Sequence, residues 1–88
     1  MKVLVGLLQA LESGQFDYSR EKCEEYDEEY IVCPVIQKAA QLALCDSKGY
    51  IDYDATRELR HAGYRIEYGD EGIHCISTKV GYIRFEEM

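Results

Sequence analysis

The sequence is poor in proline and contains no tryptophan. Its 88 residues include one proline and seven glycines, and 47% of them are hydrophobic. This is a globular composition, which excludes a disordered or collagen-like chain. The length predicts a single domain over residues 1–88, and it is too small for a (β/α)8 barrel, a kinase or a dinucleotide-binding enzyme.

Long hydrophobic runs and closely spaced cysteine pairs are also missing. The apolar stretch over residues 3–8 is too short to span a bilayer, and polar residues interrupt it on a helical period, so we expect neither a membrane segment nor a signal peptide. No two cysteines form a C-x-x-C pair; they are Cys23, Cys33, Cys45 and Cys75. We therefore expect a cytoplasmic protein with reduced thiols, no metal site and no cofactor.

Basic residues are the minority charge. Ten Lys and Arg face seventeen Asp and Glu, so the net charge is −7. The excess is local, because residues 17–29 hold seven acids and two bases, whereas residues 30–85 hold seven of each. The negative charge disfavours non-specific binding to nucleic acid or to an anionic membrane.

Hydrophobic periodicity predicts helices in the first two-thirds of the chain. Apolar residues over 3–11 recur on one helical face, although a strand over residues 2–8 is a competing interpretation. Residues 19–31 have helical spacing too, but glutamates four positions apart oppose a free helix there. Such a helix must be held by packing or by a cationic partner. A third apolar stripe, over residues 34–48, begins with a proline suited to a first helical turn.

The last third of the chain predicts one more helix and then strands. Asp52 or Asp54 caps a helix over residues 54–62, and Gly63 ends it. The hydrophobic period then changes to two. The candidate strands are residues 64–68, 73–77 and 79–85, which would form either a hairpin or a three-stranded meander. The expected class is α+β: a small helical domain ending in a β-hairpin or a three-stranded meander.

The helix over residues 54–62 carries a cationic face opposite its apolar one. The residues on this face are Arg57, Arg60, His61 and Tyr64. Arginine offers a planar fork of donors and tyrosine a stacking surface, so the face suits recognition of a phosphate or a carboxylate. The alternative is a solvated helix whose arginines pair with Asp52, Asp54 or Glu58.

A local sequence pattern joins the end of this helix to the hairpin after it. It reads Leu59-Arg60-His61-Ala62-Gly63-Tyr64-Arg65-Ile66-Glu67 and then Gly72-Ile73-His74-Cys75-Ile76. Over residues 56–76 the chain resembles winged helix-turn-helix domains of the biotin-operon-repressor type, in which a helix ends in Leu-Arg-x-x-Gly-Tyr before a wing. The resemblance implies a winged-helix-like scaffold. The chain departs from the family at the start of the recognition helix, where Ser47-Lys48 is out of register, and in four acids that would repel phosphate: Asp52, Asp54, Asp70 and Glu71.

The acidic segment is the leading candidate for contact with a partner. Its candidate residues are Glu21, Glu24, Glu25, Glu28, Tyr26 and Tyr30. Acidic side chains beside tyrosines suit docking to a basic protein, including mimicry of nucleic-acid phosphates. A solvated acidic helix is the plainer alternative. A calcium loop starting at Asp17 is disfavoured, because Lys22 stands where that loop needs a sharply turning glycine.

No pattern names a reaction. Residues 52–56 match the Asp-x-Asp-x-Thr of aspartate-nucleophile phosphatases, but the rest of the chain is too short for that fold. Helix capping explains the two aspartates better. The histidines and cysteines lack the close spacing of a zinc site. We therefore expect no enzyme and no catalytic residue.

The sequence thus favours a non-catalytic interaction or regulatory protein. We expect a protein partner bound by the acidic segment, or a homodimer formed by an apolar helix face, and an inhibitor that mimics nucleic acid is one form of this role. The alternative is a DNA-binding transcriptional regulator that uses the cationic face of the helix over residues 54–62, although the net charge disfavours it.

Overall fold

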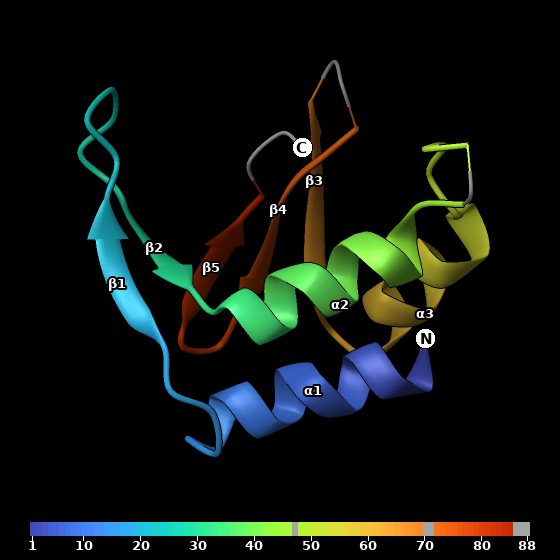
Figure 1. The fold of residues 1–88 in the computed structure, drawn as a ribbon, viewed down its shortest axis with the longest axis horizontal. Coiled ribbons are helices and arrows are strands. Elements are labelled where there is room, and N and C mark those ends of the chain that lie inside the picture. Colours follow the sequence, from blue (N-terminus) through green and yellow to red (C-terminus); the bar gives the residue numbers. More distant parts are fainter. Residues whose placement is uncertain (47, 70–71, 86–88) are drawn as a thin grey trace.

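The fold is α+β, with helices gathered on one side of a mixed sheet. The computed structural model describes residues 1–46, 48–69 and 72–85, so Ser47, Asp70 and Glu71 lie outside the described part. Three helices occur within it: α1 (Lys2–Glu12), α2 (Pro34–Leu44) and α3 (Tyr53–His61). Five strands also occur there: β1 (Ser19–Lys22), β2 (Glu29–Val32), β3 (Arg65–Gly69), β4 (Gly72–Thr78) and β5 (Gly81–Arg84). Figure 1 shows α2 in front of the sheet, α1 below α2 and α3 at the right of both.

The sheet combines a hairpin and a meander. Its strand order is β1-β2-β5-β4-β3, and every neighbouring pair is antiparallel except β2 and β5, which run parallel with Ile31 opposite Ile83. The predicted three-stranded meander is confirmed as β3, β4 and β5. The β1–β2 hairpin extends it beyond β5, so β1 and β3 are the two edges of the sheet (Figure 1).

The prediction of a helix over residues 19–31 was wrong, because this segment forms the β1–β2 hairpin. Like-charged neighbours would accumulate on one helix, whereas the hairpin places Lys22 directly opposite Glu29 and brings Lys22 Nζ to 2.7 Å from an Asp27 oxygen. The extended form also directs Ile31 into the core, where it is 1% exposed. The first two-thirds of the chain are therefore not wholly helical.

The structure also decides the alternatives left open for the three helices. The helix over 2–12 is confirmed and the competing strand over residues 2–8 is wrong. The helix that begins at Pro34 ends at Leu44 rather than near residue 48, because Cys45 is already extended and forms an isolated bridge with Ile51. Asp52, not Asp54, caps α3: its Oδ1 accepts a hydrogen bond from the backbone N–H of Ala55 at 3.0 Å.

A single apolar core lies between the helices and the sheet. The strands contribute four isoleucines that sit beside one another in register: Ile31, Ile83, Ile76 and Ile66. The helices contribute Leu4, Leu8, Leu11, Ile36, Ala40, Leu44, Ala55 and Leu59. The opposite face of the sheet carries polar and aromatic side chains, because strand residues alternate between the two faces.

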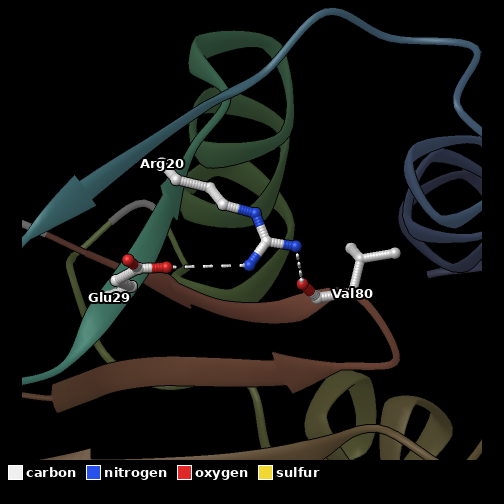
Figure 2. Close-up of polar contacts among 3 residues, drawn as sticks. All are labelled: Arg20, Glu29 and Val80. Atoms are coloured by element: carbon white, nitrogen blue, oxygen red, sulfur yellow. Dashed lines mark hydrogen bonds and ion pairs between the residues drawn. The ribbon is translucent and has the colours of Figure 1, made fainter.

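The β4–β5 turn holds the hairpin and α1 together. Arg20 Nη2 donates a hydrogen bond to the Val80 carbonyl at 2.9 Å, while Nη1 lies 3.9 Å from a Glu29 oxygen (Figure 2). The backbone N–H of Lys79 donates to Glu12 Oε1 at 3.0 Å. Gly81 completes the turn with a φ of 145°, and a Cβ there would lie 3.1 Å from Ile31 Cδ1, so the position requires glycine.

Candidate interaction surfaces

The acidic hairpin, residues 19–32, brings the predicted partner-binding residues together at one edge of the molecule. All four β1 residues are exposed. The glutamates Glu21, Glu24, Glu25 and Glu28 are exposed as well, and the tip residue Tyr26 is 66% exposed. Because β1 is an edge strand, its outer backbone groups are also available to a partner.

The two cations of the acidic hairpin are engaged with acids of the same hairpin. Lys22 pairs with Asp27 and Arg20 pairs with Glu29. Among the described residues, neither Glu24 nor Glu25 takes part in an ion pair. Most of the negative charge in this hairpin is therefore presented to solvent.

Tyr30 differs from the other predicted contact residues, because it is half-buried on the sheet face away from the helices. Its hydroxyl donates to Glu21 Oε2 at 3.1 Å, and its ring centroid lies 6.3 Å from that of Tyr82. The Arg84 guanidinium sits 5.7 Å from the Tyr30 ring centroid, a cation–π distance. Tyr30 thus fixes the hairpin against β5 instead of extending from it.

Two thiols on this sheet face have oppositely shifted pKa values. Backbone N–H groups of Tyr26 and Glu25 lower the pKa of Cys23, and Arg84 adds to the effect, since its Nη1 lies 3.1 Å from Cys23 Sγ. Burial, together with the contact of its thiol with the Glu67 carboxylate, raises the pKa of Cys75 to about 12. Both side chains are buried, with exposed fractions of 8% for Cys23 and 4% for Cys75. Arg84 lies 61 positions from Cys23, so no local pattern indicates their contact.

The predicted cationic face of α3 is divided between three environments. Arg57 and His61 are exposed toward α1, whereas the Arg60 guanidinium lies 5.4 Å from the Tyr68 ring centroid. Tyr64 is 7% exposed and belongs to the core, so its placement on the cationic face was wrong. The helical spacing of 100° per residue does not apply to Tyr64, because α3 ends at His61 and Gly63 turns the chain with a φ of 95°.

A groove of about 420 Å³ lies between α1 and α3. It is lined by Lys2, Val5, Gly6 and Gln9 of α1 and by Arg57, Glu58, His61 and Ala62 at the end of α3. In Figure 1 the N-terminal part of α1 lies beside α3, at the end of the molecule away from the acidic hairpin. Two of the predicted anion-binding residues therefore share one concave surface.

Over the described ranges 1–46, 48–69 and 72–85, no group of three His, Cys, Asp or Glu residues is arranged to hold a metal ion. None of the helices there combines the length and the apolar character needed to cross a membrane. The four cysteines are free thiols.

Comparison with known proteins identifies no relative. No family model matches the chain, no curated protein matches its sequence and no solved structure matches its fold. The functional argument therefore rests on the surfaces described above.

Proposed function

We propose that this chain is a non-catalytic interaction protein that binds a basic protein partner through the acidic hairpin. The observation that carries the proposal is the exposure of Glu24, Glu25 and Glu28 around Tyr26 at the end of a two-stranded projection. A cytoplasmic location, in which the four free thiols remain reduced, belongs to the same proposal.

The chemistry of the acidic hairpin favours a basic partner over a second copy of the chain. Two such hairpins would place like charges against each other, which costs free energy at a shared interface. A basic surface gains complementary charge contacts instead, and Tyr26 supplies an aromatic side chain of the kind enriched at interface centres. A homodimer through an apolar helix face would leave the acidic hairpin free for this partner.

Charge reversal in the acidic hairpin should strongly weaken partner binding. A Glu24→Lys, Glu25→Lys, Glu28→Lys variant replaces three attractive contacts with repulsive ones. If each contact contributes up to about 1 kcal/mol, their loss weakens the complex about 100-fold. The partner is first captured from cell extract on the immobilised chain at moderate salt. The dissociation constants of both forms for the purified partner are then measured by calorimetry.

The matched control carries the same change in net charge outside the acidic hairpin: Asp17→Lys, Asp54→Lys and Glu58→Lys. This control should bind the partner within a few-fold of the parent chain. Equal weakening by both variants would contradict the proposal, because it would reduce the interaction to overall charge. Competition by double-stranded DNA for the same partner would identify the nucleic-acid-mimicking form of the role, and absence of competition would exclude that form.

DNA binding through α3, on a winged-helix-like scaffold, is the second candidate. It is favoured by the exposure of Arg57, Arg60 and His61 and by the chain order α2, α3, β3, β4. In a gel-shift assay at low salt, the chain should then retard duplex DNA. The fraction of retarded DNA should fall steeply as the salt concentration rises. The Arg57→Glu, Arg60→Glu variant should lose the shift while the acidic-hairpin variant keeps it. A shift that survives loss of both arginines would rule out this mode.

A further inference from the structure

The groove between α1 and α3 is lined by apolar groups and by cationic side chains. Val5, Gly6 and Ala62 supply hydrocarbon or bare backbone, while Lys2, Arg57 and His61 supply donors from two helices. Glu58 is the one acid among the lining residues that the structure describes. The volume of the groove, about 420 Å³, falls within the range of small-molecule sites. A ligand matched to this surface has an apolar body and one anionic group.

Gly6 keeps the groove open. It lies inside α1, where glycine costs roughly 1 kcal/mol relative to alanine. A Cβ built at Gly6 meets no heavy atom within 4 Å. Close packing within this chain therefore does not explain why position 6 lacks a side chain. The glycine therefore maintains an empty space on the groove wall at some cost to the helix.

The cationic lining side chains come from both helices and can orient an anion between them. Arg57 offers a planar fork that can hold a carboxylate or phosphate through two hydrogen bonds, and His61, one turn later on α3, offers a ring nitrogen. Lys2 adds a positive charge from α1. The second arginine of α3, Arg60, is directed instead to Tyr68, so it lies outside this arrangement.

We propose that this groove binds a small amphiphilic anion, with its hydrocarbon portion over Gly6 and its carboxylate or phosphate between Arg57 and His61. Charge complementarity and the open position at Gly6 carry the inference. The site is independent of the acidic hairpin, because the two surfaces lie at opposite ends of the molecule (Figure 1).

The test is an NMR titration of the isotope-labelled full chain with three probes. Decanoate carries both features of the proposed ligand, decanol carries the chain alone, and inorganic phosphate carries the charge alone. Decanoate should shift the amide signals of Gly6, His61 and Ala62 and reach saturation, and it should bind at least tenfold more tightly than either other probe. Equal binding of decanol and decanoate, or of phosphate and decanoate, would overturn the proposal.

Three variants locate the site. Gly6→Leu fills the groove while improving helix propensity, so it should abolish decanoate binding without lowering thermal stability. Arg57→Gln should weaken binding about tenfold, and the matched Arg60→Gln on the same helix should leave it unchanged. Retained binding in Gly6→Leu, or equal effects of the two arginine variants, would place the ligand elsewhere and refute the assignment. Because Arg57 is exposed, its variant remains informative even where Gly6→Leu fails to fold.

Discussion

Replacing Ile83 by alanine should lower the free energy of unfolding by about 2–5 kcal/mol. Ile83 is fully buried on β5, the central strand of the sheet, and it is in register with Ile31 on one side and Ile76 on the other. Its side chain therefore joins the acidic hairpin to the meander. Shortening it leaves a cavity at that junction, and the neighbouring isoleucines lie on separate strands that cannot close it without moving the sheet.

Urea denaturation followed by circular dichroism measures this loss. Leu42→Ala is the matched control, since Leu42 is also a large aliphatic residue but is 74% exposed on α2. Its effect should stay within about 0.5 kcal/mol. Similar effects of the two substitutions would contradict the packing described for the sheet. A changed dependence on urea concentration in Ile83→Ala would instead indicate that the acidic hairpin detaches before the rest unfolds.

The parts of the fold that sequence reasoning predicted correctly depend on local signals. Asp52 and Gly63 delimit α3 through capping and a positive φ, both of which act within a few residues. The meander follows from alternation of apolar and polar residues after Gly63. Such signals are legible in a single sequence because the residues that interact are neighbours in the chain.

The acidic hairpin was missed because its stabilising contacts are distant in sequence. Ile31 is placed by its parallel register with Ile83, and Arg20 by a carbonyl 60 positions away at Val80. Within residues 19–31 the apolar residues do fit a helical period, so local spacing misled. The repulsion between glutamates four positions apart was the signal against a helix, and it was the better guide.

The candidate sites also divide into those with a local sequence signal and those formed by residues distant in the sequence. Exposed acids and arginines could be named from the sequence, but the groove could not, because it forms between residues 2–9 and 57–62 of separate helices. Gly6, inside an otherwise good helix, is a local irregularity that the sequence reasoning did not use, and the structure places it on the lining of this groove. The contact of Arg84 with Cys23 had no local signal at all.

Raising the pH above 9 should destabilise the protein through Cys75. The folded state holds the Cys75 proton until about pH 12, whereas an ordinary thiol releases it near 9.0. Above pH 9 the unfolded state therefore binds fewer protons, and the free energy of unfolding falls by about 1.4 kcal/mol per pH unit. Between pH 9 and 10.5 the expected loss is about 2 kcal/mol, and it continues toward pH 12.

The other shifted groups do not imitate this effect over the same interval. The pKa of Cys23 is lowered, so its contribution to stability increases only up to the ordinary thiol value of 9.0 and is constant above it. The pKa values of Tyr64 and Tyr82 are raised from 10.0, so their destabilising contributions begin about one pH unit later than that of Cys75. The interval from pH 9 to 10 is thus dominated by Cys75.

Cys75→Ala isolates the contribution of this thiol, because alanine does not titrate. Unfolding free energies from urea denaturation, measured under reducing conditions at intervals from pH 8 to 10.5, should fall less steeply for the variant than for the parent chain. The difference in slope above pH 9 should approach the full value for one proton, whatever the variant costs at neutral pH. Parallel pH profiles would show that Cys75 ionises at its ordinary pKa, and they would place its thiol in water instead of between its cross-strand neighbours Glu67 and Arg84.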